Sequence, residues 1–385
     1  MADIGQRPIH LLSAAWLCLV LCALVSPGLL SSARAGDGIR IAMITARTGE
    51  AGKSNAISFD GARFAVECIN ESGGILGQKV ELLEFDNRGT PEGSAVAARR
   101  AIAAGVTAVV GCNWSSHSLA MAEVLQKAGV PMISHMSTNE AVTRVGDCIF
   151  RICFTDSFQG SGLARFALEK LDAATAVVLV DVSRAYCRGL AQSFADAFER
   201  GGGKVVWRGE YEARTLDVDA VLGEVARHQA DVLFAPGGYG DVSALFANTR
   251  DQNIKMTLMT GDGVGPRMYE YIGAKSECIY FSSHWSRWSD TPQSRDFVSR
   301  YEARVGVAPS DTSALVYDSF MVLKDAIERA GTTVHSDVRD ALATTAGFEG
   351  VTGTIRFNEF GDPIKPLVIN QFRFGGVMFV DSIQP

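Results

Sequence analysis

From Ile39 onward, short apolar runs rich in β-branched residues alternate with longer stretches whose apolar residues recur at helical spacing. The stretch after the first run shows this pattern clearly, because one helical face carries Ile57, Gly61, Phe64, Ala65, Cys68 and Ile69. Strands that alternate with helices are typical of βαβ units, in which consecutive strands are parallel. The pattern therefore predicts an α/β protein built on doubly wound parallel sheets.

The β-like runs fall into two series. The first covers residues 39–44, 80–85, 107–111 and 130–134, and the second covers 176–180, 204–207, 231–235, 256–259 and 277–281. This number of strands is larger than a single open sheet usually contains, so we expect two lobes of similar design. Helical patterns then resume over 295–305, 312–330 and 334–344, and three final β-like runs cover 351–357, 367–374 and 377–383.

The first 35 residues differ from the rest. Arg7 precedes an apolar run from Leu11 to Val25, and the small residues Ala33 and Ala35 follow after a break. A charged start, an apolar stretch and a small-residue exit describe a secretory signal peptide. The apolar run is shorter than the roughly 20 residues that span a bilayer. We therefore expect cleavage after Ala35 and an exported mature chain.

Composition narrows the functional classes. The chain has 385 residues, is 47% hydrophobic and 21% charged, and carries a net charge of −7. An acidic chain without a long Lys/Arg run is not expected to bind nucleic acid. No Cys-x-x-Cys motif or His-containing ligand cluster is present, so we expect no metal site and no cofactor. We expect buried free thiols beyond the signal peptide, although pairing of Cys148 with Cys153 stays open.

The candidate chemistry follows the strands, because ligands of open α/β sheets bind beyond the carboxyl ends of the strands. In the first half, the hydroxyls of Ser115, Ser116 and Thr138 stand where helices or loops begin. Hydroxyls and free amides at a helix start form a cradle for an anion. Ser115 or Thr138 alone could equally be a helix cap.

The second half offers the opposite chemistry. Tyr186, Tyr239 and Asp262 follow strands there, and a carboxylate beside two aromatic rings suits a cation with an apolar neighbour. Asp262 alone could also be a cap. Facing each other, the two sets would match the carboxylate and ammonium groups of an amino acid.

Several segments together resemble a known family. They are Ile39–Ile44 with Thr48-Gly49, Asp60-Gly61-Ala62 through Ile69-Asn70 to Gly73-Gly74-Ile75, Asp86-Asn87, Gly111–Ser116, Val130–Ser134, and Asp181 through Tyr186 to Ala191. With these segments in this order, the chain resembles periplasmic solute-binding proteins of the leucine/isoleucine/valine-binding type, which serve ABC importers. The resemblance runs from about Ile39 to Ile383.

The resemblance implies the type I periplasmic-binding fold, with two lobes joined by a three-strand hinge and the ligand trapped between them. Lobe 1 would comprise residues 36–155 and 285–358, and lobe 2 residues 156–284 and 359–385. It also implies a periplasmic location, an amino acid or similar small amine-bearing carboxylate as ligand, a membrane permease as partner, and no enzymatic activity.

The resemblance also implies a role in ligand binding for individual residues of this chain. Ser115 and Thr138 would bind the ligand carboxylate together with the Ser116 region, and Met136 would contribute backbone. Asp262 would take the ammonium group, and Tyr186 and Tyr239 would pack against the ligand or bond to it. The positions that depart from the family pattern are candidates to line the pocket: Ser54, Asn55, Trp114 and His135. These departures put branched-chain specificity in question.

Two other classes stay open. A sensory or regulatory binding module would share the fold. A secreted α/β hydrolase could use Ser115 and His117, but the chain has no Gly-x-Ser-x-Gly elbow, P-loop or complete Gly-x-Gly-x-x-Gly after a strand. We therefore expect Ser115 to cap a helix and His117 to be solvated. His284, Trp285 and Trp288 could line the cleft, but we expect them to form a packing cluster where the lobes meet.

Overall fold

The computed structural model describes residues 1–2, 38–49 and 51–385. Apart from residues 1–2, the predicted signal peptide lies outside the described residues. Within Gly38–Pro385 the chain forms two parallel-sheet lobes and a small two-stranded sheet, as the alternating pattern predicts. We call the elements around the first sheet lobe 1 and those around the second sheet lobe 2.

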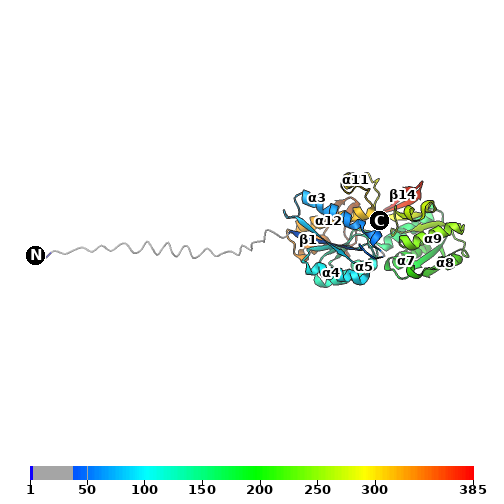
Figure 1. Ribbon diagram of the computed structural model, residues 1–385, viewed down its shortest axis with the longest axis horizontal. Coiled ribbons are helices and arrows are strands. Elements are labelled where there is room, and N and C mark those ends of the chain that lie inside the picture. The colour runs from blue at the N-terminus through cyan, green and yellow to red at the C-terminus, as the bar shows by residue number, and fades with distance from the viewer. Residues whose placement is uncertain (3–37, 50) are drawn as a thin grey trace. The chain divides into compact units, whose positions relative to one another are not determined.

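Lobe 1 is built on a five-stranded parallel sheet with the order β2-β1-β3-β4-β5. Its strands are β1 (Ile39–Thr45), β2 (Val80–Asp86), β3 (Ala108–Val110), β4 (Met132–Ser134) and β5 (Ile149–Arg151). Helices α3 (Ile57–Glu71) and α12 (Asp311–Ala330) lie on one face, and α4 (Pro91–Ala103) and α5 (Ser115–Ala128) on the other (Figure 1).

Alternation along β1 explains both cores of lobe 1. Ile41 and Met43 pack with α3 and α12, whereas Ala42 and Ile44 pack with α4 and α5. Successive side chains of a strand point to opposite faces, so a central strand covered by helices on both sides is apolar throughout.

Lobe 2 contains a seven-stranded sheet with the order β14-β13-β10-β9-β8-β6-β7. Its strands are β6 (Thr175–Asp181), β7 (Lys204–Tyr211), β8 (Val232–Phe234), β9 (Thr257–Thr260), β10 (Tyr280–Ser283), β13 (Leu367–Arg373) and β14 (Gly376–Ile383). Helices α6 (Asp156–Lys170) and α7 (Ala185–Arg200) share one core with it, and α8 (Val218–Val225) and α9 (Tyr239–Asp251) share the other. The strands β13 and β14 are antiparallel to their neighbours, and the remaining pairs are parallel.

The predicted strands are all present, and two strands were missed. These are β5, only three residues long, and β11 (Ala346–Gly350), which pairs with β12 (Gly353–Arg356) outside both large sheets. The predicted helices appear as α11 (Pro292–Val305), α12 and α13 (His335–Ala343). Short elements complete the order: α2 (Gly52–Asn55), α10 (Met268–Ile272) and the 3₁₀ turns η1 (Glu140–Val145), η2 (Ala213–Thr215) and η3 (Gly273–Ser276).

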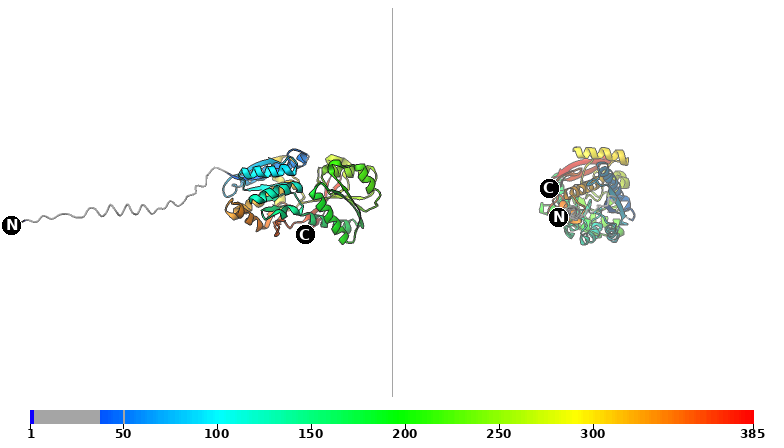
Figure 2. Two further views of the ribbon diagram at one scale, coloured as in Figure 1. Left: turned by 90° about the horizontal axis from the view of Figure 1, so that it is seen from below. Right: turned by 90° about the vertical axis from the view of Figure 1, so that its left-hand side faces the viewer.

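The chain passes between the sheets after β5, after β10 and after β12, and these crossing segments contact one another. Arg151 Nε donates to Asp362 Oδ1 at 2.6 Å, and Lys365 Nζ donates to the carbonyl oxygen of Ile152 at 3.2 Å. The rings of Phe154 and His284 stack with centroids 3.8 Å apart. The three segments therefore form one polar hinge, while the residue limits given above for each lobe stay a prediction. The C-terminus lies beside the junction of the lobes (Figure 1, Figure 2).

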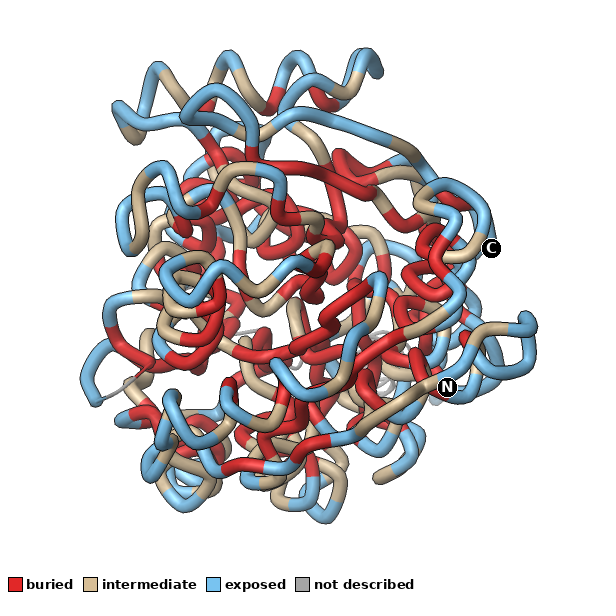
Figure 3. Tube along the Cα trace, turned by 90° about the vertical axis from the view of Figure 1, so that its right-hand side faces the viewer, coloured by how far each residue is buried: buried red, intermediate tan, exposed pale blue. Residues whose placement is uncertain are grey.

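Buried residues run through the interior of the described chain and exposed ones cover its outside (Figure 3). The thiols of Cys68, Cys112, Cys148, Cys153 and Cys187 are free and buried, which confirms that expectation for them. Cys278 is free but exposed, so the expectation was wrong there. No helix in the described ranges is long and apolar enough to cross a bilayer.

Candidate binding site

The candidate residues lie at the carboxyl ends of strands in both lobes. In lobe 1, Ser115 begins α5 after β3, and Thr138 follows β4. In lobe 2, Tyr186 lies in the first turn of α7, Tyr239 begins α9, and Asp262 follows β9. Parallel strands bring their carboxyl ends to the same edge of a sheet, so each lobe presents one such edge.

The lobe 1 edge offers hydrogen-bond donors. Ser115 is 2% exposed, and its Oγ accepts a hydrogen bond from the amide of Asn139 at 3.3 Å, which leaves the hydroxyl proton free to donate. Thr138 Oγ1 is buried and has no partner among the described residues. Trp114 occupies the N-cap of α5 without a side-chain cap bond, and Ser116 follows in the first turn. These hydroxyls and helix-start amides suit an anion.

The lobe 2 edge offers acceptors. Asp262 is 6% exposed, and its Oδ1 accepts from Gln159 Nε2 at 2.5 Å, while its Oδ2 accepts from His284 Nε2 at 2.8 Å. Gln159 Oε1 is buried without a partner in the described chain. The Tyr186 hydroxyl accepts from the amide of Gly263 at 3.1 Å. Burial and the charge of Asp262 raise the pKa of Tyr186 well above its ordinary value, so the hydroxyl stays protonated.

A buried polar wall lies beside these groups in lobe 1. His135 Nε2 bonds to Ser58 Oγ at 3.3 Å, and Ser58 donates to Asn113 Oδ1 at 3.2 Å. Burial, together with the nearby charge of His284, lowers the pKa of His135 to about 3, so its ring is neutral at physiological pH. Asn55 is 2% exposed, and its Nδ2 has no partner in the described ranges.

The remaining candidates are half-buried. Ser54 donates to Asn55 Oδ1 at 3.1 Å. Met136 Sδ lies 4.0 Å from Thr312 Oγ1 at the start of α12. Trp114 packs against Arg184, whose guanidinium carbon lies 5.0 Å from the ring centroid.

Two expectations around Ser115 were wrong. Trp114, not Ser115, is the N-cap residue of α5, because Ser115 already has helical backbone geometry. His117 is 2% exposed rather than solvated, and burial, followed by the charge of Arg184, lowers its pKa to about 4. The ring packs against Trp114, with centroids 5.1 Å apart, because α5 turns this face inward.

One contact between the lobes runs beside Ser115. Asn139 Nδ2 donates to Asp156 Oδ2 at 3.1 Å and to the carbonyl oxygen of Ala185 at 3.0 Å. Arg184, which packs on Trp114, is itself held by Asp181 and Asp241 at 3.2 and 3.0 Å. We call this set the Asn139 contact.

A second contact, which we call the Lys53 contact, joins the α2 loop of lobe 1 to α10 of lobe 2. Arg267 Nη1 donates to the carbonyl oxygen of Lys53 at 3.1 Å. The Lys53 ammonium lies 5.5 Å from the centroid of the Tyr271 ring, which stacks on Tyr239 at 5.2 Å. Arg267 in turn lies 5.9 Å from the Tyr239 centroid. The two lobes are therefore in direct contact in this structure.

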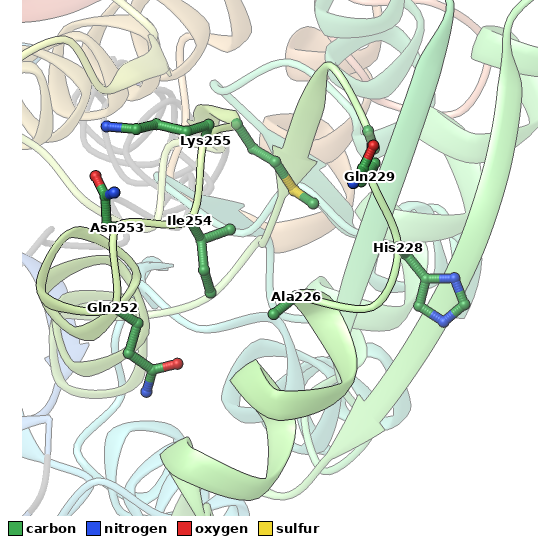
Figure 4. A pocket seen from close by; sticks show the side chains of 9 residues that line it. Ala226, His228, Gln229, Gln252, Asn253, Ile254 and Lys255 are labelled. Carbon is green, nitrogen blue, oxygen red and sulfur yellow. The ribbon is translucent and has the colours of Figure 1, made fainter.

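A surface hollow of about 420 Å³ lies elsewhere in lobe 2 (Figure 4). It is lined by residues that precede β8 and β9, including His228, Gln229 and Lys255. These residues lie at the amino-terminal edge of the strands, opposite the candidate site. None of the predicted site residues lines this hollow.

The sequence analysis missed two polar residues beside the candidate site, Asn139 and Gln159. For Gln159, the signal in the sequence was a glutamine on the inward face of α6. His284 was expected in a packing cluster, with a place in the cleft as the alternative; its ring stacks on Phe154 and its Nε2 bonds to Asp262. Of the other cluster members, Trp285 is buried among aromatic rings, whereas Trp288 is 73% exposed and lies outside it.

No group of three or more His, Cys, Asp or Glu side chains able to hold a metal ion occurs in the part of the chain that the structure describes. The candidate residues supply hydrogen-bond donors at the lobe 1 edge and acceptors at the lobe 2 edge. These groups are complementary to a small molecule with separate negative and positive ends.

Comparison with known proteins agrees with this architecture. The leucine-specific-binding protein of Salmonella typhimurium is 25% identical over 341 residues, which cover 88% of this chain and 90% of that protein. A crystal structure of a leucine-binding protein from Thermotoga maritima superposes with a TM-score of 0.86 at 33% identity, covering 90% of this chain and 99% of that one. A branched-chain amino acid transporter substrate-binding protein from Streptococcus pneumoniae, in complex with isoleucine, gives a TM-score of 0.85 at 29% identity, covering 91% and 100%.

The family model for periplasmic binding proteins matches residues 38–376, nearly the whole described chain. The likeness extends through both sheets and all three crossings. The chain therefore belongs to the periplasmic binding protein family.

Proposed function

We propose that this protein captures an amino acid between its two lobes outside the cytoplasm and delivers it to the membrane permease of an ABC importer. The observation that carries the proposal is the opposition of donors at the lobe 1 edge to a buried carboxylate at the lobe 2 edge. The curated relatives support it, since their names assign leucine, isoleucine, valine, threonine and alanine to them as ligands.

The carboxylate end of the ligand would bind to lobe 1. Ser115 and Thr138 donate their hydroxyl protons, and the amides at the start of α5, near Ser116, add the partial positive charge of the helix N-terminus. Backbone near Met136 completes this side. Thr138 Oγ1, buried without a partner in the described ranges, would then gain an acceptor.

The ammonium end would bind to lobe 2. Asp262 supplies the negative charge, and Gln159 Oε1 supplies a neutral acceptor. Gln159 and His284 hold the carboxylate of Asp262 in place by donating one hydrogen bond to each oxygen. A preorganised carboxylate loses little conformational freedom on binding. Tyr186 and Tyr239 would pack against the ligand between the two ends.

Closure of the two lobes follows from the position of the proposed ligand-binding groups at both lobe edges. A ligand that bonds to both edges stabilises only the arrangement in which the lobes meet, so binding shifts the population toward the closed state. The Asn139 contact and the Lys53 contact add direct interactions between the lobes to that state. The closed form is the one that the permease would recognise.

The protein would act in the periplasm, because cleavage after Ala35 would release the mature chain there. The protein would act as a binding protein without enzymatic activity, without a cofactor and without nucleic acid as a partner.

Calorimetry with the twenty L-amino acids tests the proposal directly. At least one amino acid should bind with micromolar or tighter affinity and raise the melting temperature by mass action. The matching amide, which lacks the carboxylate, and the N-acetyl derivative, which lacks the ammonium group, should bind at least a hundredfold more weakly. Absence of binding by every amino acid would refute the proposal.

A further inference from the structure

The lobe 1 wall beside the site is polar where a branched aliphatic side chain would need apolar contacts. Asn55, Ser58 and His135 are all buried there, and His284 lies across from them at the end of β10. Three of these side chains hold a buried polar atom without a partner in the described chain: Asn55 Nδ2, His135 Nδ1 and His284 Nδ1. Buried polar atoms are nearly always hydrogen-bonded, to protein or to ordered water, so these three are available to bond to a ligand.

These side chains belong to one region. Asn55 and Ser58 are three residues apart on a continuous helical turn, because Ala56 between α2 and α3 is itself helical. His135 bonds to Ser58, and the neighbouring Met136 contacts Thr312 at the start of α12. Asp311, also at the start of α12, accepts from Ser283, which precedes His284. The start of α12 thus brings the two imidazoles to the same place.

The protons on His135 follow from its hydrogen bonds. Asn113 Oδ1 can only accept, so the Ser58 hydroxyl donates to it. The Ser58 oxygen must then accept from His135, which places the ring proton on Nε2. The neutral ring of His135 therefore presents a bare acceptor at Nδ1.

His284 follows the same logic. The carboxylate of Asp262 only accepts, so the ring proton that faces it is on Nε2 of His284, and Nδ1, which has no partner in the described chain, is the ring nitrogen left to accept. Asn55 presents the opposite chemistry, because Nδ2 carries two N–H donors. The region therefore offers one donor group and two acceptors.

We propose that the amino acid bound here has a primary carboxamide in its side chain, as glutamine and asparagine do. This inference rests on the proposed function of the same site. The carbonyl oxygen of the carboxamide accepts from Asn55, and its two N–H groups donate to His135 and His284. No proton or bond is exchanged, so recognition depends on this pattern of donors and acceptors alone.

Other side chains leave part of the pattern unpaired. A leucine side chain pairs none of the three atoms. A glutamate carboxylate satisfies Asn55 but faces two imidazole lone pairs without a proton to donate. A lysine ammonium satisfies the imidazoles but leaves the Asn55 donor unpaired. Each unpaired buried group lowers affinity by roughly five- to hundredfold.

Calorimetry with L-glutamine, L-asparagine, L-leucine, L-glutamate and L-lysine tests the inference. One of the two carboxamides should bind at least tenfold more tightly than the other three amino acids. Tightest binding of leucine, glutamate or lysine would overturn the carboxamide assignment while the proposed capture of an amino acid stands. If none of the twenty amino acids binds, both fall together.

Substitutions in the lobe 1 wall test the recognition of the ligand side chain separately from the groups proposed to bind its carboxylate and ammonium ends. Asn55→Leu should weaken glutamine or asparagine binding at least tenfold and strengthen leucine binding, with the melting temperature of the free protein as the check on folding. His135→Leu is the second variant, with the same expected direction. Gln252→Leu is the matched control, since Gln252 is exposed at the opposite edge of lobe 2. Unchanged carboxamide-to-leucine preference in both folded wall variants would overturn the inference.

Discussion

The Asp262→Asn variant removes the negative charge that we propose pairs with the ammonium group of the ligand. The change keeps the size of the side chain and one oxygen acceptor, so packing around Gln159 and His284 is preserved. Only the charge and one acceptor are lost, which makes the variant a measure of the electrostatic part of binding.

The size of the effect follows from burial. The side chain of Asp262 is 3% exposed, so solvent screens its interaction with the ligand poorly. A hydrogen bond to a charged group contributes about 1.5–3 kcal/mol, and breaking a buried ion pair costs about 3–5 kcal/mol. An intermediate loss of ~2–4 kcal/mol corresponds to roughly 30- to 1000-fold weaker binding.

The free protein should also lose some stability. The new amide nitrogen faces a donor, either Gln159 Nε2 or His284 Nε2, and one unsatisfied buried group costs about 1–3 kcal/mol. Urea unfolding of the free variant should show this loss with an unchanged denaturant slope, which indicates that the fold is retained.

Isothermal titration calorimetry with the best amino acid from the panel measures the affinity. Asp251→Asn is the matched control, because Asp251 pairs with Lys275 on the surface of lobe 2 and should change neither affinity nor stability by more than about 0.5 kcal/mol. Binding by the folded Asp262→Asn protein within threefold of the unchanged protein would refute the assignment of Asp262 to the ammonium group.

Three further predictions test the packing, closure and hinge. A Cβ at Gly261 would lie 2.3 Å from the Tyr186 hydroxyl oxygen, so Gly261→Ala should weaken ligand binding at least tenfold. Gly240→Ala is the control, because a Cβ at Gly240 would have no described atom within 4 Å and should leave the affinity unchanged. Equal affinities of the two variants in calorimetry would contradict this prediction. Arg267→Ala removes the hydrogen bond to the Lys53 carbonyl oxygen that joins the lobes. Stopped-flow measurements should therefore show ligand release about 2- to 10-fold faster, and an unaltered release rate would exclude a role in closure. Burial lowers the pKa of Lys365 to about 8, so between about pH 8 and its unfolded value near 10.4 the unfolded chain binds more protons and the unfolding free energy rises with pH, by on the order of 3 kcal/mol. Lys365→Met should abolish that rise in urea titrations at pH 7.5, 9 and 10, and parallel pH profiles of the two proteins would show the reasoning to be wrong.

The fold was largely predictable because its pattern is local. Apolar alternation and helical spacing within each segment are set by which faces the segment buries, so β1 and α3 are visible from their own residues. β5 and β11 were missed for the same reason. β5 has only three residues, and β11 pairs with β12 without a large core beneath it, so neither carries a periodic signal of its own.

The candidate site was predictable only in part. Ser115, Thr138 and Asp262 could be named as candidates because each follows a strand and stands at a position to which the family resemblance assigns a ligand contact. His284 and Gln159 could not be assigned to Asp262, because their contacts join residues 22 and 103 positions apart in the chain. No local pattern encodes such a pairing. The protonation of His135 likewise depends on Ser58 and Asn113, which lie in other segments.

The distribution of thiols has a practical consequence. Within residues 38–385, Cys278 is exposed while the other cysteines are buried. Within these residues, a maleimide should therefore add a single adduct to the native protein, and further adducts should appear only as molecules open. Mass spectrometry of the alkylated chain then counts opening events without any engineered label. Because a bound solute holds the lobes together, the rate at which these later adducts accumulate becomes a readout of occupancy at equilibrium.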